Sequence, residues 1–271
     1  MQRLRLTFSC EEEVKYISHL DLMRFWERAL RRASLPLAYS AGFSPHPRIS
    51  IAAPLAVGYT SSGELMDVFL DSYVPPREVL VRVNSQLPKG IDILEVADVN
   101  PLAPSLQSVV RAAEYLVRVD AQGRSQEEVK NAIGWMMSLE TLPWEHLRDG
   151  QIRNYDLRAL VLELWLAERS DYQCLIGMRL KADGSGAGRP EQVAQALGLT
   201  ERPTSLHRTR LILQETSQER ATSPGRGQPT PARNISRAGE GGQQRTNQVG
   251  PRRAAARTPS HTATPKPPAE C

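Results

Sequence analysis

The chain has 271 residues, of which 40% are hydrophobic and 24% charged, an ordinary composition for a globular protein. This length allows about two domains, and no stretch approaches the ~18 consecutive apolar residues that span a bilayer. Neither a signal-peptide core nor a disulfide framework is visible, because the N-terminal stretch is polar and the cysteines are few and widely spaced: Cys10, Cys174 and Cys271. We therefore expect a reducing, cytoplasmic setting and no membrane partner.

The positive charge of the chain is concentrated near its C-terminal end. From Thr216 onward there are nine Lys or Arg against three Asp or Glu, so the preceding 215 residues carry 25 basic and 27 acidic side chains. The part expected to fold is thus slightly acidic. Any nucleic-acid surface on it must be local.

The first strand and helix have clear periodic patterns. Residues 2–8 alternate polar and apolar side chains, as in a half-buried strand. A helix is expected over residues 19–33, with Ser18 as its N-cap, Asp21 reaching back to the cap, and Pro36 ending it. Its apolar side chains at helical spacing form the expected core stripe: Leu22, Trp26, Ala29 and Ala33.

The elements expected next are two strands, a helix and a strand, over residues 48–58, 64–72, 75–88 and 90–99. In the second of these strands, period-two spacing puts Met66, Val68 and Leu70 on the buried face. Asp67 then lies on a face that we expect to be at least partly open. This element order is that of a ferredoxin-like (βαββαβ) domain, predicted over residues 1–100.

The same order recurs after a loop rich in Pro and Ser, which predicts a second ferredoxin-like domain over residues 110–214. Its first helix should carry a capping box of Ser125 and Glu128, and its last should end at Gly198. The predicted fold class is therefore α+β, with two tandem ferredoxin-like domains. Residues 215–271 have almost no large apolar side chains and should form a disordered basic tail that adds affinity for RNA or serves solubility alone.

Residues 35–67 stand out because glycines and prolines enclose aromatic, hydroxyl and cationic side chains. Pro45 and Pro47 exclude a helix or central strand there and favour a rigid exposed loop. Loops on a stiff scaffold often bind ligands. The candidate binding residues of this loop are Tyr39, Ser40, Phe43, Ser44, His46 and Arg48.

The first helix adds a basic ladder of the kind that contacts an RNA backbone, formed by Arg24, Arg28, Arg31 and Arg32. A solvated helix face, partnered by Glu27, is the alternative interpretation. Tyr39 and Phe43 offer rings on which bases stack. Phe43 is equally compatible with a loop anchor buried under the prolines.

Other charged side chains give weaker signals. His19 with Asp21 resembles an oriented acid–base pair, but the two do not share a helical face, and capping explains Asp21. Glu64 and Asp67 are candidates for binding a cation or a substrate amine, although two acids alone do not indicate a metal site. We expect ordinary surface charge for them and no metal in the chain.

Six blocks of the sequence carry a family resemblance. SHLDL, YSAGFSPHPR and GELMD, followed by DLRALV, GRPEQVAQALGL and HRTRL, resemble the radical SAM-linked protein family over about residues 1–213. That resemblance implies association with a radical SAM protein, which would hold the iron–sulfur cluster and S-adenosylmethionine. This chain has no cysteine triplet for such a cluster, which makes it the accessory partner.

The leading hypothesis is thus a non-catalytic partner that binds substrate, RNA or an RNA-associated target, for a radical SAM enzyme. The alternative is a metal-independent endoribonuclease with His19 or His46 as general acid–base, since tandem ferredoxin-like order resembles that of CRISPR-repeat endoribonucleases in topology. A third hypothesis is a purely structural subunit. The sequence does not name the substrate or the oligomeric state.

Overall fold

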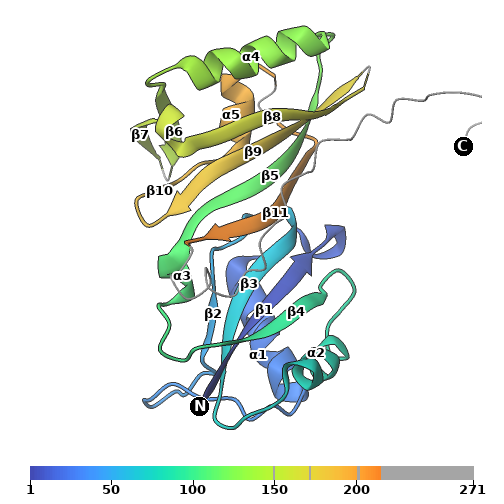
Figure 1. Cartoon of the computed structure of the whole chain (residues 1–271), viewed down its shortest axis with the longest axis vertical. Coiled ribbons are helices and arrows are strands. Elements are labelled where there is room, and N and C mark those ends of the chain that lie inside the picture. Colours follow the sequence, from blue (N-terminus) through green and yellow to red (C-terminus); the bar gives the residue numbers. More distant parts are fainter. Residues whose placement is uncertain (149, 171, 200–201, 215–271) are drawn as a thin grey trace, which may run out of the picture. The chain divides into compact units, whose positions relative to one another are not determined.

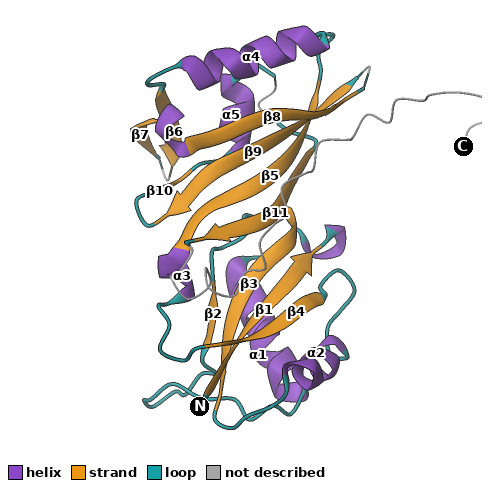
Figure 2. Ribbon diagram, viewed as in Figure 1, coloured by secondary structure: helices purple, strands orange, loops and turns teal. Residues whose placement is uncertain are grey.

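The computed structural model describes residues 1–148, 150–170, 172–199 and 202–214, and these form a mixed α+β fold built on one large mixed sheet (Figures 1 and 2). The tail predicted over 215–271 lies outside the described residues. No helix in the described ranges is long and apolar enough to cross a bilayer. Figure 2 shows α1 (His19–Arg32) and α2 (Pro76–Asn84) beside the strands of the N-terminal half of the chain. The helices α4 (Gln126–Ser138) and α5 (Pro190–Ala196) lie beside the strands of the C-terminal half.

The large sheet contains nine strands: β1 Gln2–Cys10, β2 Ile49–Ile51, β3 Thr60–Leu70, β4 Ile93–Val99, β5 Val110–Asp120, β8 Val161–Arg169, β9 Gln173–Asp183, β10 Gly186–Ala187 and β11 Ser205–Leu213. A separate hairpin is formed by β6 Pro143–Arg148 and β7 Gln151–Asp156. The α-helices are α1 His19–Arg32, α2 Pro76–Asn84, α3 Leu106–Val109, α4 Gln126–Ser138 and α5 Pro190–Ala196, with 3-10 turns at Glu12–Val14 and Arg158–Leu160.

Strand pairing divides the sheet into two halves. The first half runs β4-β1-β3-β2 and the second β8-β9-β5-β11, with antiparallel neighbours throughout each half. A short parallel pairing of β11 with the start of β3 joins the halves into one sheet. The division into domains over 1–100 and 110–214 stays a prediction.

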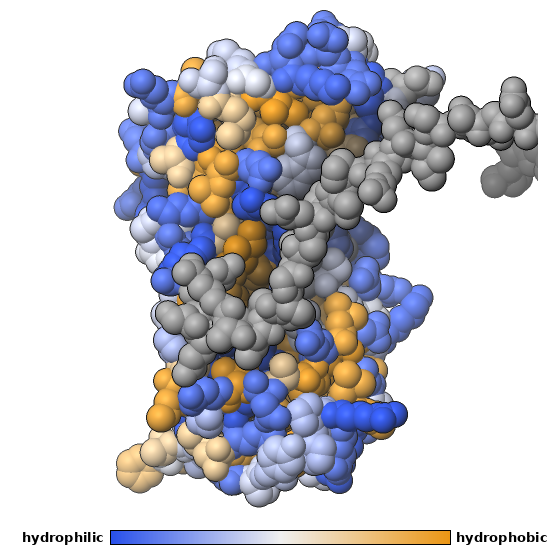
Figure 3. All heavy atoms as spheres, viewed as in Figure 1, coloured by the Kyte–Doolittle hydropathy of each residue, from blue (hydrophilic) through white to orange (hydrophobic). Residues whose placement is uncertain are grey.

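Alternation along β1 builds the first core as expected. Leu4, Leu6 and Phe8 are fully buried, and the Phe8 ring meets the edge of the Trp26 ring of α1 at 4.9 Å between centroids. The predicted stripe of α1 is buried too, as are Met66, Val68 and Leu70 of β3. A second core lies under α4 and α5, and in Figure 3 hydrophilic side chains cover part of α4, whereas Trp135 near the end of this helix is half-exposed.

The helix ends follow the predicted capping. The Ser18 hydroxyl accepts the Asp21 N–H and donates to the Asp21 carboxylate, at 3.2 and 2.8 Å. Both bonds of the Ser125–Glu128 capping box are present. Gly198, with a φ of +69°, follows α5 in the left-handed conformation that glycine favours.

Three expectations from the sequence are wrong. The strand expected over residues 48–58 is confined to Ile49–Ile51, because the start of β3 pairs with β11 there instead of a longer β2. No strand was predicted over residues 151–155, which lie in β7. Asp67 is fully buried, since Arg3 and Arg5 of the neighbouring β1 neutralise it on the face expected to be open.

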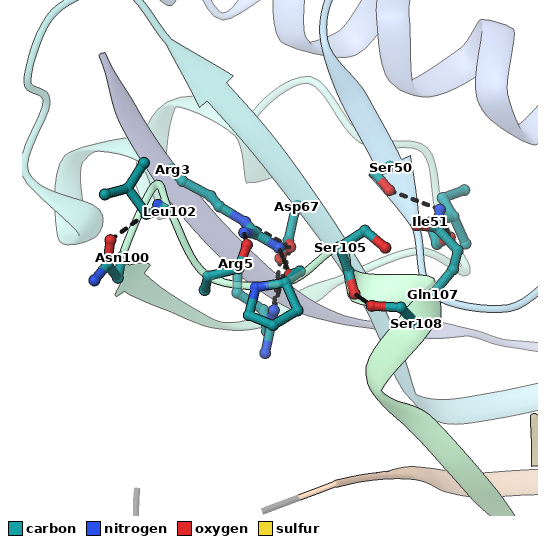
Figure 4. Close-up of polar contacts among 12 residues, drawn as sticks. Arg3, Arg5, Ser50, Ile51, Asp67, Asn100, Leu102, Ser105, Gln107 and Ser108 are labelled. Atoms are coloured by element: carbon teal, nitrogen blue, oxygen red, sulfur yellow. Dashed lines mark hydrogen bonds and ion pairs between the residues drawn. The ribbon is translucent and has the colours of Figure 1, made fainter. Parts of the chain in front are cut away.

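The loop between the halves is attached to the first half by polar contacts, shown in Figure 4. The Arg3 guanidinium, bound to Asp67 through Nε and Nη2, also donates to the carbonyls of Ala103 and Pro104 at 2.6 and 2.8 Å. Gln107 donates to the Ser50 hydroxyl at 2.6 Å. The connection is therefore held against β1 and β2 by side chains.

At the β3–β11 junction, a buried ion pair crosses between the halves. Arg208 of β11 donates from Nε to Glu64 Oε1 of β3 at 2.7 Å and from Nη2 to the other carboxylate oxygen. Remaining guanidinium N–H groups reach the carbonyls of Ala53 and Pro54. Burial lowers the pKa of Arg208, but the charge and hydrogen bonds of Glu64 outweigh this and raise it, so Arg208 stays cationic.

Gly63→Ala tests the close approach of the two strands. A Cβ at position 63 would lie 2.5 Å from the Thr209 carbonyl oxygen and 2.9 Å from the Arg210 Cα, which are backbone atoms. We expect the free energy of unfolding, measured in urea, to fall by about 1–3 kcal/mol. The control is Gly134→Ala on α4, where nothing lies within 4 Å and stability should rise slightly. Equal effects of the two changes would contradict the tight junction.

Arg208→Met tests the ion pair, because it leaves Glu64 buried without its cation. The expected loss of unfolding free energy is about 3–5 kcal/mol, and the double change Arg208→Met with Glu64→Leu should lose clearly less, since no charge is then stranded. Chemical denaturation of all three proteins measures this. A double variant no better than the single one would contradict the pairing.

Candidate functional site

Helix α1 presents the predicted basic ladder to solvent. At 3.6 residues per turn, Arg31, Arg24, Arg28 and Arg32 lie within an arc of about 100°, on the side away from the buried Leu22 and Trp26. The Arg24 side chain is 68% exposed and lies 3.3 Å from Asp21. These side chains therefore provide cations to solvent without disturbing the core.

Residues 38–48 form a hairpin-like loop beside β3, and backbone hydrogen bonds hold its two ends together. Its base is held by hydrogen bonds from Ala38 N to the Phe69 carbonyl, from Phe69 N to the Arg48 carbonyl, and from Arg48 N to the Ala38 carbonyl. Higher up, Ser40 N donates to the His46 carbonyl, and His46 N donates to the Ser40 hydroxyl at 3.1 Å. Ser40 thus shapes the loop, which protrudes at the lower left of Figure 1.

The tip of this loop carries an unburied aromatic side chain. Phe43 is fully exposed, and Tyr39 is 45% exposed. The interpretation of Phe43 as a buried anchor under the prolines is therefore wrong. Ser44 is also exposed at the tip. The Phe43 ring is therefore accessible to a partner.

His46 connects the loop to α1. Its Nδ1 lies 3.9 Å from Oε1 of Glu27, and the same carboxylate lies 3.7 Å from Arg31. Glu27 thus brings the loop beside the exposed side of the helix. We call the resulting exposed set, with its mixed basic and aromatic character, the arginine–loop surface: Arg24, Arg28, Arg31, Tyr39, Phe43 and His46.

Two other predicted residues are used elsewhere. The Arg48 guanidinium lies 4.5 Å from the centre of the Phe69 ring, on which Arg3 also packs at 5.5 Å. Because Phe69 alternates with the core residues of β3, this contact is on the sheet face opposite α1. Arg32 donates to the Gln86 carbonyl at 3.1 Å, which ties it to the end of α2.

The two acids of the predicted set are not surface groups. Glu64 is 1% exposed and bound to Arg208, while Asp67 is fully buried between Arg3 and Arg5 (Figure 4). Their charges are neutralised within the chain, so the expectation of ordinary surface charge is wrong for both. Within the described ranges, no group of three or more His, Cys, Asp or Glu is arranged to hold a metal ion.

The two candidate catalytic histidines are in different surroundings. His19 begins α1 beside a small cavity that it shares with Cys10 and Tyr59, and its Nδ1 is buried without a partner among the described residues. Asp21 is bound to Ser18 and Arg24, so it does not orient His19. His46 faces Glu27 instead. Burial also raises the pKa of the Cys10 thiol to about 12, which keeps it protonated.

Later landmarks of the sequence also have structural roles. In the DLRALV block, Asp156 accepts the N–H groups of Leu142 and Arg158. The Arg158 guanidinium donates to the carbonyls of Met137, Leu139 and Val161. The pairing of Glu64 with Arg208 was not predicted, and the charged residues alternating along β11 are its one signal in the sequence.

The comparison with protein families decides the classification. Residues 3–190 match the family described as "Uncharacterized protein conserved in bacteria (DUF2344)". The chain belongs to this family. The family description names no reaction or ligand, and no curated protein sequence matches this member.

Among solved structures, this member of the DUF2344 family is similar to a Cbf5-Nop10-Gar1 complex, with 11% identity and a TM-score of 0.42, covering 78% of this chain and 48% of that one. An archaeal box H/ACA sRNP Nop10-Cbf5 complex matches with 11% identity and a TM-score of 0.39, with 78% and 47% covered. The chain thus spans about half the length of these structures. A likeness at this level carries no information on ligands.

Phe43→Ser tests whether the loop tip serves the fold. Because the ring is fully exposed, the free energy of unfolding should change by less than about 0.5 kcal/mol. Phe8→Ala, which empties a fully buried position, is the contrasting control and should cost about 3–5 kcal/mol. A substantial loss with Phe43→Ser would mean that the ring packs against the protein.

Proposed function

We propose that this protein is a non-catalytic subunit that binds single-stranded RNA through the arginine–loop surface, for use by a radical SAM enzyme. The observation that supports the RNA proposal is the contact of α1 with the loop at Glu27, whose carboxylate lies within 4 Å of both Arg31 and His46. The sequence resemblance to the radical SAM-linked family supports the choice of partner.

The chemistry of the surface fits an unpaired strand. Arginines contact phosphates along the backbone, while an exposed ring beside them stacks on a base that is not paired. Arg24 and Arg28 are exposed on α1, and Phe43 is exposed on the loop that contacts α1 through His46 and Glu27. Phe43 projects from the closed loop, so no buried contact has to break before a base can meet it.

The proposed scaffold is a pair of tandem ferredoxin-like halves. The spatial strand orders β4-β1-β3-β2 and β8-β9-β5-β11 support this topology. Along the chain, a helix follows the first and the third main strand of each half: α1 and α2 follow β1 and β3, and α4 and α5 come after β5 and β9. In the first half, the candidate surface is formed by the first helix and the loop that follows it. The sheet face opposite α1 in that half holds the buried Arg3–Asp67 contacts instead.

The endoribonuclease alternative has less support from the geometry. A general acid–base pair needs its members within hydrogen-bond reach of one reacting group. His19 lies at the start of α1, whereas His46 meets Glu27 two turns further along the helix. Cleavage of RNA by the wild-type chain, abolished by His46→Ala with binding retained, would replace the binding proposal.

The test is fluorescence anisotropy with a labelled single-stranded RNA. Arg24→Glu with Arg28→Glu should weaken binding at least tenfold and lower the slope of log K against log salt by about 1.4, since each neutralised phosphate of a single strand contributes ~0.7. Phe43→Ala should cost about 1–3 kcal/mol of binding free energy. The control reverses two exposed cations elsewhere, Arg77→Glu on α2 and Lys130→Glu on α4, and should have a much smaller effect.

If the control pair weakened RNA binding equally, binding would depend on the net charge of the protein and not on this surface. That result would contradict the proposed site. If RNA does not bind at all, co-purification with the radical SAM protein decides whether this surface docks protein. Loss of that protein with Arg24→Glu and Arg28→Glu, but not with the control pair, would move the proposal from RNA to a protein partner.

A further inference from the structure

A separate pocket of about 360 Å³ lies in the second half of the chain. It is formed by the β6–β7 hairpin, by β10 and by the residue preceding α5, elements that lie close together at the upper left of Figure 1. It shares no residue with the arginine–loop surface. Its volume is within the usual range of ~300–1,000 Å³ for small-molecule sites.

Two arginines and a histidine line this pocket. His146 and Arg153 are directly opposite each other across the hairpin, which puts their side chains on one face. Arg189 directs Nη1 to within 3.3 Å of His146 Nε2. Neither arginine forms an ion pair with a carboxylate of the described residues. The fold thus holds donors together without an anion from the described ranges between them.

The acids near this cluster are engaged elsewhere. Asp156 lines the pocket, but its Oδ1 accepts the N–H groups of Leu142 and Arg158 at 2.8 and 3.0 Å. Glu191, two residues beyond Arg189, is hydrogen-bonded to the Tyr59 hydroxyl. Asp156 adds a negative charge to the lining, but it is held by backbone N–H groups and, within the described ranges, forms no ion pair with Arg153 or Arg189, so both guanidinium groups can still bind an anion.

The remaining lining has both polar and apolar character. The Tyr155 hydroxyl is hydrogen-bonded to Gln192, whose amide Nε2 is buried with no partner among the described residues. Leu160, Gly186 and Ala187 add an apolar section with short side chains. A few polar groups beside an apolar wall are typical of sites for small organic ligands.

We propose that this pocket binds a phosphomonoester of nucleotide size. Arg153 and Arg189 donate to the phosphate oxygens, as arginine forks do in phosphate sites, and His146, whose Nε2 accepts from Arg189 Nη1, holds that guanidinium in place. The organic group lies against Tyr155 and the apolar section. A free nucleotide and the 5′-phosphate end of an RNA strand present the same chemistry, and the test separates them.

The test is isothermal titration of the full chain with 5′-AMP, with adenosine, and with one RNA hexamer bearing either a 5′-phosphate or a 5′-hydroxyl. AMP should bind and adenosine should not. If the phosphorylated hexamer binds at least about tenfold more tightly than AMP and than its hydroxyl form, the ligand is an RNA end. If AMP binds as tightly as the phosphorylated hexamer, the ligand is a free nucleotide.

Arg153→Gln and Arg189→Gln should each weaken AMP binding about tenfold or more, because each removes charge-assisted hydrogen bonds. Arg77→Gln on α2 is the matched control and should leave the affinity unchanged. Arg153 is exposed, so we expect the Arg153→Gln variant to fold. Because Arg153 forms no ion pair with an acid of the described ranges, its replacement should not lower the melting temperature.

The proposal would be overturned if neither AMP nor the phosphorylated hexamer bound the wild-type chain at about 1 mM. A Kd above that concentration corresponds to a binding free energy weaker than ~4 kcal/mol. Unchanged affinity in both glutamine variants would also overturn it. These results are distinguishable from failure of the RNA-binding proposal, since Arg24→Glu with Arg28→Glu leaves this pocket intact and should not alter AMP binding.

Discussion

The buried pair of Arg208 and Glu64 is the interaction on which the continuity of the sheet depends. The parallel pairing of β11 with β3 is short, with His207 opposite Thr60 and Arg208 opposite Ser61, so backbone bonds alone provide little attachment there. The ion pair, itself anchored to the carbonyls of Ala53 and Pro54, adds several buried bonds at the same place. An arrangement that left either buried charge without its partner would be strongly destabilising, so strand pairings that separate Arg208 from Glu64 are disfavoured.

This constraint also explains the GELMD block. Gly63 permits the approach of the β11 backbone, Glu64 binds Arg208, and Asp67 binds Arg3, which in turn holds the loop between the halves. Three polar or small residues that look like part of a ligand site are thus used for assembly. By contrast, the neighbouring YSAGFSPHPR block has its aromatic tip in solvent and is stabilised mainly through its own backbone.

Two groups of arginines can be distinguished among the described residues, those that hold the fold together and those for which we propose a ligand. Arg3, Arg158 and Arg208 have their donors occupied by carboxylates or carbonyls of the chain. Arg24 and Arg28 are exposed on α1, and Arg153 and Arg189 meet at a pocket. Cations that stay in contact with solvent add little to the folded state. Their positions therefore mark the two surfaces for which we propose anionic ligands.

The sequence by itself determined the elements whose signals are local: the alternation of β1, the apolar stripe of α1, the Ser125 capping box, and the exposed loop between Pro36 and Arg48. These depend on neighbours within a few residues, which spacing reveals. Tertiary structure alone decided that Glu64 meets Arg208 from 144 residues away, that Asp67 is buried, and that His146 and Arg189 share a pocket. Strand order sets such contacts, and periodicity says which face a residue occupies but not which strand lies beside it.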